Sequence, residues 1–195
     1  MNHYFSNNKD LKDEFFQFEV VIKDHKMVFK TNSGVFSKQR LDYGTKVLLE
    51  HLEFNDPKTI LDCGCGYGPI GIFAKKANPY AQVTMIDINQ RALELSKGNA
   101  LLNDCKIIAM ESDLLTNVTG KFDLIISNPP IRTGKQNIFT LYEQVALRLN
   151  PNGEFWIVIQ KKQGANSTLT KLKEIYKDVE IIAKDKGYFV LRSTM

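Results

Sequence analysis

The stretch Ile60-Leu-Asp-Cys-Gly-Cys-Gly-Tyr-Gly68 decides the fold of this chain. The apolar run Thr59–Asp62 predicts a buried strand, and the helix predicted around Ile70–Lys76 follows the glycines. Glycines let the backbone turn tightly and let a ligand approach main-chain N–H groups at a helix N-terminus. The stretch therefore predicts a strand, a loop and a helix that together bind a ligand.

The same alternation of strand and helix continues along the chain. Further strands are predicted at Phe18–Ile22, Met27–Thr31, Gln82–Asp87, Lys106–Met110, Phe122–Ser127, Gly153–Gln160, Val179–Ala183 and Tyr188–Arg192, and helices at Leu41–Leu52, Asn89–Leu102, Ile138–Leu149 and Leu169–Tyr176. Strands that alternate with long helices indicate βαβ units and a mostly parallel sheet. We predict an α/β fold with a Rossmann-like, doubly wound, seven-stranded sheet.

Both ends of the chain depart from this alternation. Gly187 lies between two strands that are too close for a helical crossover, so a hairpin with an antiparallel edge is expected there. Near the N-terminus, the polar segment 23–26 joins two short strands into a small hairpin. We predict a single domain over residues 1–195, with a hairpin extension at 1–35 and a core at 36–195.

Composition excludes several classes of protein. The chain has 195 residues, of which 43% are hydrophobic and 25% charged, as in ordinary globular proteins. Its longest apolar runs, such as Phe122–Ile126, are far shorter than the ~18 residues of a membrane span. The first residues contain no hydrophobic signal segment, and three cysteines argue against a disulfide framework. We therefore expect a cytoplasmic protein without a membrane partner.

Acidic residues follow three successive predicted strands. Asp62 precedes the glycines and Asp87 closes the next strand. Asp113 comes just past the strand after that. Ligands of open α/β sheets bind beyond the carboxyl ends of the strands. A dinucleotide would need Gly-x-Gly-x-x-Gly and positive surroundings for its pyrophosphate, which Asp62 would repel. A nucleoside with a cationic amino acid end, S-adenosylmethionine, fits these carboxylates instead.

The fourth strand of the core ends in Ile126-Ser-Asn-Pro-Pro-Ile131. Prolines deny backbone donors and stiffen the chain, whereas the carbonyl groups before them remain acceptors. The side-chain oxygen of Asn128 and the carbonyl of Pro129 would both accept hydrogen bonds from one planar NH2 group. The pattern predicts a site that orients an amine, and the alternative is a rigid turn.

Together these motifs resemble the class I S-adenosylmethionine-dependent methyltransferases that modify planar amino groups. The chain is more closely similar to the catalytic C-terminal domain of the small-subunit ribosomal RNA guanine-N2 methyltransferases. That similarity covers roughly residues 30–192 and rests on Gly34-Val-Phe-Ser37, Leu41-Asp42, Asp62-Cys-Gly-Cys-Gly66 and Phe122-Asp-Leu-Ile-Ile-Ser-Asn-Pro-Pro130. Single-domain bacterial and archaeal relatives share the Asn-Pro-Pro-Ile-Arg-x-Gly-Lys form of residues 128–135.

The resemblance implies a role for each motif. The residues that it assigns to the cofactor are Asp62, Gly64 and Gly66 for the methionine part, Asp87 for the ribose and Asp113 for the adenine. Asn128, with Pro129 and Pro130, would orient the target nitrogen, and Asn128 would also face the methyl end of the cofactor as one of its binding residues. Ile131 is a departure, because the DNA adenine, protein glutamine and many RNA guanine methyltransferases have an aromatic ring at this position. Phe36 or Tyr188 would have to supply that stacking.

The positive charge of the chain lies in its last third. Residues 132–195 carry 11 basic and 6 acidic side chains. Such an excess is typical of a phosphate-facing surface, although a lysine-rich solvated face has the same composition. The residues expected around the substrate are Phe36, Ile131, Arg132, Lys135, Lys161 and Lys162. The partner expected from the resemblance is RNA, either ribosomal RNA or a ribosomal subunit.

Other functions remain open at this point. One alternative is a methyltransferase for protein glutamine or a small amine, although a glutamine-methylating relative would usually carry Asn-Pro-Pro-Tyr. Another is an RNA-binding or assembly factor that keeps the cofactor site without catalysis. A structural zinc site needs four ligands, and the histidines are distant in sequence from Cys63, Cys65 and Cys105. We expect buried cysteines and no metal, and the sequence leaves the oligomeric state open.

Overall fold

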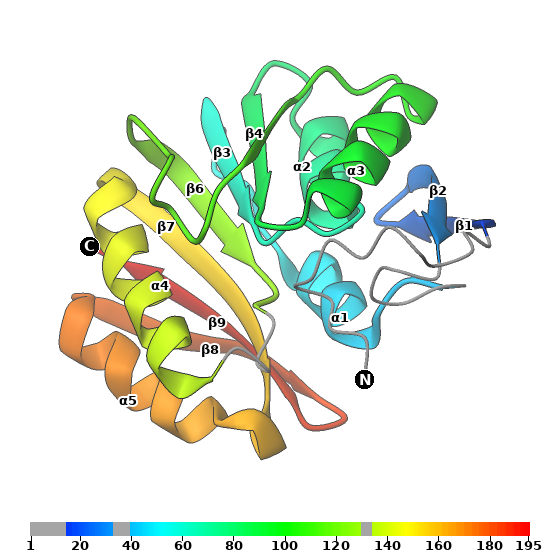
Figure 1. Cartoon of the computed structure of the whole chain (residues 1–195). Helices are drawn as coiled ribbons and strands as arrows, with labels where there is room; N and C mark the ends of the chain where they lie inside the picture. Colours follow the sequence, from blue (N-terminus) through cyan, green and yellow to red (C-terminus); the bar gives the residue numbers. More distant parts are fainter. Residues whose placement is uncertain (1–14, 33–39, 130–133) are drawn as a thin grey trace.

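A seven-stranded sheet forms the centre of the protein (Figure 1). The computed structural model describes residues 15–32, 40–129 and 134–195. The strands of the sheet are β3 (Thr59–Cys63), β4 (Gln82–Asp87), β5 (Ile108–Glu111), β6 (Phe122–Ser127), β7 (Leu149–Gln160), β8 (Asp178–Asp185) and β9 (Tyr188–Thr194). The helices are α1 (Tyr43–His51), α2 (Pro69–Ala77), α3 (Gln90–Leu102), α4 (Lys135–Arg148) and α5 (Ala165–Ile175), with the short 3-10 helix η2 (Lys161–Gln163).

The sheet is doubly wound, as predicted. Its strand order is β5-β4-β3-β6-β7-β9-β8, and β3 pairs in parallel with both β4 and β6. The chain runs outward from β3 to β5 and then returns to β6 on the other side of β3. The strand order therefore reverses between β3 and β6, and ligands of such sheets bind beyond the carboxyl ends of the strands at this point.

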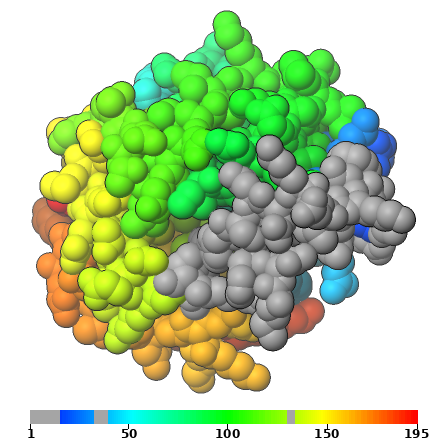
Figure 2. Space-filling model, in the orientation of Figure 1, coloured from blue at the N-terminus to red at the C-terminus, as the bar shows by residue number. Residues whose placement is uncertain are grey.

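Alternate residues of the central strands are buried on opposite faces of the sheet. Ile60 packs in the core under α1, α2 and α3, whereas Leu61 packs in the core under α4 and α5. Ile126 and Ile125 of β6 divide in the same way. A strand buried on both faces needs a continuous apolar run, which these strands have. Figure 1 shows the helices on the two faces, and Figure 2 shows α4 and α5 side by side along one border.

The predicted antiparallel hairpin forms the C-terminal border of the sheet. β9 is antiparallel to both neighbours, β7 and β8, so the antiparallel strand lies inside the sheet and β8 forms its edge. The physical reason is burial, since Val190 and Leu191 of β9 are fully buried, whereas the residues of β8 are all exposed or only partly buried. The tight turn at Lys186 and Gly187 has positive φ angles of 42° and 83°.

The predicted N-terminal hairpin forms a separate two-stranded sheet. Its strands are β1 (Phe15–Ile22) and β2 (His25–Asn32). The turn is two residues long rather than four, and Lys23 and Asp24 have the left-handed φ angles, 45° and 66°, of a tight hairpin turn. Met27 and Phe29 of β2 are fully buried, and β2 lies against α2 and α3.

The remaining differences are at element boundaries. The helix predicted from Ile138 begins at Lys135, and the strand predicted from Gly153 begins at Leu149. The helix predicted near Leu169 begins at Ala165, and the strand predicted at Lys106 begins at Ile108. None of the helices within the described ranges is long and apolar enough to cross a membrane.

Candidate functional site

The glycine loop between β3 and α2 forms the floor of the site. Gly64, Gly66 and Gly68 have φ angles of 75°, 56° and 94°, which residues other than glycine rarely adopt. The amides of Gly64 and Cys65 both donate to the carbonyl of Ile86, at 2.9 and 2.8 Å. The loop is therefore held against the end of β4, with the N-terminus of α2 directly after it.

Asp62 lies beneath this loop and is fully buried. Its Oδ2 accepts a hydrogen bond from the Gly71 amide at 2.8 Å, whereas its buried Oδ1 has no hydrogen-bond partner among the described residues. Burial raises the pKa of Asp62 to about 7, with a smaller contribution from the charge of Asp87, and the Gly71 amide opposes this shift. A cationic hydrogen-bond donor stabilises the charged form of a buried carboxylate such as this one.

Asp87 joins three elements at the end of β4. It is almost fully buried, and its Oδ2 accepts from the Gly66 amide at 2.9 Å. Its Oδ1 accepts from the Asn89 amide, also at 2.9 Å. Asn89 is the N-cap of α3, and its Oδ1 accepts from the amides of Arg91 and Ala92. The carboxylate thus fixes the glycine loop relative to the start of α3.

Ile88 follows the end of β4, and Asp113 follows the end of β5. Asp113 is exposed, and its carbonyl accepts from the amide and the hydroxyl of Thr116, which closes a turn. The amide of the preceding Ser112 donates to the carbonyl of Asp87 at 3.1 Å, so this turn adjoins the end of β4. Ile88 is 42% exposed directly after Asp87. No local sequence pattern singles out this apolar side chain.

Asn128 is oriented by the N-terminus of α1. Its Nδ2 donates to Oδ2 of Asp42 and to Oγ1 of Thr45, both at 2.9 Å. An ionised carboxylate only accepts hydrogen bonds, so the nitrogen end of the amide must face Asp42. The amide oxygen therefore points away from α1. Asp42 is also the N-cap of α1, since its Oδ2 accepts from the Thr45 amide at 3.0 Å.

The strand before Asn128 is tied to the strand before the glycine loop. The hydroxyl of Ser127 donates to the carbonyl of Cys63 at 2.7 Å, which brings the ends of β6 and β3 together. Pro129 follows and is buried. The other predicted site residues in this region, Phe36, Pro130, Ile131 and Arg132, lie outside the described residues.

The three predicted lysines within the described ranges are exposed at the same edge of the sheet. Lys135 is the first residue of α4, after β6, and its Nζ lies 5.2 Å from the centroid of the Phe139 ring. Lys161 and Lys162 form η2 directly after β7, and the Lys161 amide donates to the carbonyl of Gly187 at 2.7 Å. Their positions at the carboxyl ends of two strands agree with the expected location.

Tyr188 lies close to Asp42, the residue that accepts a hydrogen bond from Asn128. A Cβ atom on Gly44 would be only 2.8 Å from Cε1 of Tyr188 and 3.1 Å from Oδ2 of Asp42. The ring therefore packs against a place where α1 has no side chain. Partial burial and the nearby Asp42 carboxylate raise the pKa of Tyr188. Tyr188 thus lies beside Asp42, the residue that holds the side chain of Asn128.

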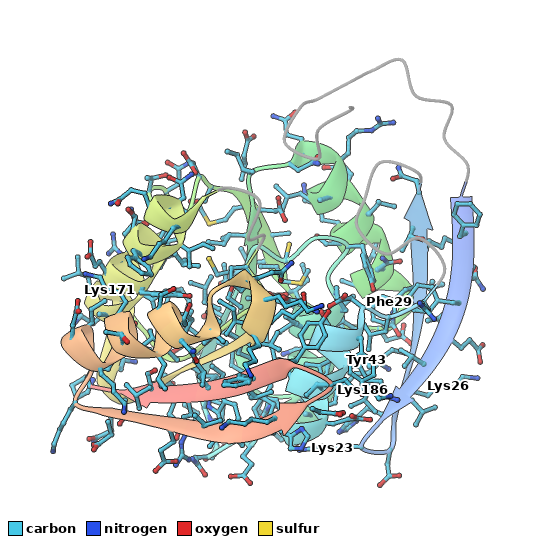
Figure 3. All side chains as sticks on the ribbon, turned by 90° about the horizontal axis from the view of Figure 1, so that it is seen from below. Lys23, Lys26, Phe29, Tyr43, Lys171 and Lys186 are labelled. Atoms are coloured by element: carbon cyan, nitrogen blue, oxygen red, sulfur yellow. The ribbon has the colours of Figure 1, made fainter. Side chains whose placement is uncertain are left out.

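The side chain of Tyr43, the first residue of α1, binds the tip of the β8–β9 hairpin. The hydroxyl of Tyr43 donates to Oδ2 of Asp185 at 2.6 Å. Nζ of Lys186 lies 4.9 Å from the centroid of the Tyr43 ring, and Figure 3 shows these two side chains close together. The rings of Tyr43 and Tyr188 are 5.8 Å apart. These contacts place a basic and aromatic rim next to α1, and no local sequence pattern predicts them.

The three cysteines are buried, as predicted. Burial raises the pKa of each thiol, and for Cys63 and Cys65 the charges of Asp62 and Asp87 add to this shift. Among the residues with described positions, no group of three or more histidine, cysteine or acidic side chains is arranged to hold a metal ion.

Sequence relatives give this site a context. Residues 26–192 match the family model of the methyltransferase small domain. The chain is 39% identical to the uncharacterised protein YbxB of Bacillus subtilis (strain 168), over 98% of this chain and 97% of that protein. It is also 39% identical to the ribosomal RNA small subunit methyltransferase C of Haemophilus influenzae (strain ATCC 51907 / DSM 11121 / KW20 / Rd), over 77% of this chain and 46% of that protein. The chain thus spans about half the length of the ribosomal RNA methyltransferases that it matches.

Solved structures share the fold. The T. thermophilus 16S rRNA N2 methyltransferase RsmC, in complex with AdoMet and guanosine, has a TM-score of 0.82 at 24% identity, over 92% of this chain and 50% of that one. The ribosomal protein L11 methylase of Lactobacillus delbrueckii subsp. bulgaricus has a TM-score of 0.69 at 25% identity, over 82% and 87%. Together with the sequence relatives, these structures confirm the predicted fold and the predicted resemblance to small-subunit ribosomal RNA methyltransferases.

Proposed function

Because the chain belongs to the methyltransferase small domain family and is an S-adenosylmethionine-dependent methyltransferase, we propose that it methylates an exocyclic amino group, namely guanine N2 of ribosomal RNA. The observation that carries this proposal is the orientation of Asn128. Its amide nitrogen is bound by Asp42 and Thr45, which leaves the amide oxygen to accept a hydrogen bond from a substrate amine.

The residues at the strand ends fit the cofactor. The cofactor has an ammonium group at its amino acid end, and the buried Oδ1 of Asp62 lacks a donor within the described residues. The glycines of the loop let the main chain come close to the methionine part. The Asp87 carboxylate would accept hydrogen bonds from the ribose hydroxyls. Asp113 and the exposed Ile88 would border the adenine.

The chemistry asks the protein mainly for positioning. When bound, the cofactor supplies a methyl group that its sulfonium already activates. The exocyclic amine of a purine is a poor nucleophile, because its lone pair is delocalised into the ring. The oxygen of Asn128 and the carbonyl of Pro129 would accept hydrogen bonds from its two N–H groups and favour the pyramidal form, whose lone pair can attack. The N–CH3 bond would form as the S–CH3 bond breaks to leave a neutral thioether, and the methylated amine would then lose its extra proton to water. Orientation and aligned acceptors supply this stabilisation without a strong general base.

Ribosomal RNA as the substrate is supported by the names of the relatives and by the charge of the site edge. Lys135, Lys161 and Lys162 are exposed beyond β6 and β7, where they would contact phosphates. Phe36, Ile131 and Arg132 belong to the same proposed surface. The aromatic surface for a guanine ring would come from Tyr188 or Phe36. With ribosomal RNA as the substrate, the place of action that we propose is the cytoplasm.

A methyl-transfer assay tests the proposal. The purified chain is incubated with tritiated S-adenosylmethionine and, in parallel, with free ribosomal RNA, assembled small ribosomal subunits and a protein extract. We expect label in RNA from one of the first two reactions, and N2-methylguanosine when the labelled RNA is digested to nucleosides.

Other outcomes would contradict the proposal in different ways. Label in protein would favour a glutamine methyltransferase, and label in the small-molecule fraction of the extract would favour a small-molecule amine methyltransferase. Cofactor and RNA binding without label in any fraction would favour an RNA-binding or assembly factor. A methylated nucleoside other than N2-methylguanosine would keep the RNA substrate and change the target atom.

A further inference from the structure

We propose that Asn99 is a positioning residue of the cofactor site, through which the N-terminal hairpin supports the glycine loop. This inference rests on the part of the proposed function that puts S-adenosylmethionine on the glycine loop, and it is independent of the methyl acceptor. It gives the hairpin, which the sequence predicts as an extension, a role in cofactor binding.

The hairpin is attached to α3 by two asparagine side chains. Oδ1 of Asn99 accepts from the Lys30 amide at 2.7 Å, and its Nδ2 donates to the Lys30 carbonyl at 2.9 Å. Asn103 makes the same pair of bonds with Val28, at 3.0 and 2.6 Å. Four helical residues rise ~6 Å and two strand residues ~7 Å, so the two amides match the free edge of β2.

These side chains take the place of a third strand. A two-stranded hairpin alone is at most marginally stable in water, because one edge of each strand is unpaired. Asparagine is a poor residue for a helix interior, so Asn99 inside α3 needs a tertiary reason, whereas Asn103 is the C-cap of that helix. The bonds of Asn99 to Lys30 supply that reason, and Asn103 adds the bonds to Val28.

Only Asn99 also reaches the glycine loop. Its Nδ2 donates to the carbonyl of Tyr67 at 2.9 Å, and Tyr67 stands between two glycines with left-handed backbone angles. The Tyr67 side chain is 4% exposed, and its ring packs edge-on against Phe29 of β2, with centroids 5.4 Å apart. Figure 3 shows Phe29 on β2. One side chain thus connects β2, α3 and the loop.

The hydrogen-bonding groups of the Asn99 side chain are all used in this position. The side chain is 1% exposed, and both of its N–H groups and its oxygen have partners. Loss of the side chain would leave the Tyr67 carbonyl without its buried donor, at the point where the loop must keep its shape for the cofactor. Asn103 lacks a bond to the loop, and its additional bond goes to the Asn99 carbonyl within α3.

Asn99→Ala and Asn103→Ala form a matched pair of variants. Each removes two bonds to β2, and only Asn99→Ala removes the bond to Tyr67. We expect both variants to lower the melting temperature. By calorimetry without RNA, Asn99→Ala should weaken S-adenosylmethionine binding about tenfold, the usual effect of leaving a buried polar group unpaired, while Asn103→Ala should change it by less than about threefold. Equal losses of affinity in the two variants, or none in Asn99→Ala, would overturn the proposal.

Hydrogen exchange of the wild-type chain gives a second test, which applies even if Asn99→Ala does not fold. A saturating amount of S-adenosylmethionine should slow exchange of the Lys30 amide by about fivefold or more, because binding and hairpin docking are linked. The amide of Lys177, which donates to Thr194 far from the loop, serves as the control. Unchanged exchange at Lys30 would contradict the coupling. Neither test requires a methyl acceptor, so failure of RNA methylation would not affect them.

Discussion

Asp62 and Asn128 differ in which hydrogen-bond partners they have. Asp62 has an oxygen without a donor among the described residues, whereas the amide nitrogen of Asn128 has two acceptors. Asp62 is fully buried with one unpartnered oxygen within the described structure, so burial penalises its charged form and a cationic ligand group would stabilise it. Asn128 has both donor positions of its amide occupied by Asp42 and Thr45, and it offers an acceptor. The first residue is therefore suited to hold a positive ligand group and the second to orient an amine.

The raised pKa of Asp62 predicts a pH dependence of stability. Its carboxyl binds a proton more tightly in the folded chain, with a pKa of about 7, than in the unfolded chain, with a pKa near 4. The contribution of Asp62 to the free energy of unfolding is therefore fully present below about pH 4. It is lost as the pH rises through 7, a change on the order of 4 kcal/mol.

Urea unfolding without cofactor at pH 5 and pH 8 measures this change. We expect the wild-type chain to lose more unfolding free energy between the two pH values than Asp62→Asn does. Asp113→Asn, a change at an exposed carboxylate, should behave like the wild type. Equal pH dependence in the wild type and Asp62→Asn would show that the carboxyl is not perturbed.

At the scale of elements, the N-terminus of α1 does two things with one carboxylate. Asp42 caps the helix by accepting from the Thr45 amide, and it also holds the amide nitrogen of Asn128. Helix capping alone would be satisfied by serine or threonine. The longer acidic side chain is needed to reach across to the end of β6, which couples the position of α1 to the orientation of Asn128.

Asp42→Ser separates these two roles. Serine keeps the cap but cannot reach Asn128, so we expect unfolding free energy within about 1 kcal/mol of the wild type. The rate of methyl transfer at saturating cofactor should fall about tenfold, because the acceptor is no longer fixed. Asp42→Ala, which loses both roles, should lower stability as well. Full activity in Asp42→Ser would mean that Asn128 is oriented by other contacts.

The basic residues of α4 and η2 predict a salt dependence of RNA binding. If Lys135, Lys161 and Lys162 contact phosphates, changing all three to glutamine should reduce the slope of log affinity against log salt by about 2, at ~0.7 for each single-strand contact. Filter binding over a range of salt concentrations measures the slope. The matched control changes Lys58, Lys106 and Lys121, which lie at the amino ends of β3, β5 and β6. Equal slopes for the two triple variants would remove the RNA surface from this edge.

At the scale of the whole molecule, the fold determines which parts of the site can be predicted from sequence. Asp62, Asp87 and Asn128 each follow an apolar strand, and the carboxyl ends of parallel strands meet at one edge. Asp42 and Asn99 are different, because their partners are 86 and 69 residues away along the chain. A capping residue and a helical asparagine have no local pattern that reports such contacts.

The position of β9 is a further example. Its apolar residues and the tight turn before it predict a hairpin, but they do not determine which of the two last strands pairs with β7. That choice depends on the total burial of Val190 and Leu191 on a sheet that forms only when the chain has folded. Local patterns thus predict the elements and the strand-end residues, whereas the order of the last strands and the supporting contacts require the whole fold.

Single-turnover methylation by Asn128→Ala, with saturating RNA and cofactor, tests the central claim most directly. In the proposed mechanism Asn128 would contact the target amine mainly in the transition state, so its loss should lower the rate constant of methyl transfer. We expect a decrease of roughly a few hundredfold, comparable to the loss of an oxyanion-hole donor, while calorimetry finds cofactor affinity within about twofold of the wild type. A variant that retains the full rate of methyl transfer would contradict the assignment of Asn128 and, with it, the proposed methylation of an amine.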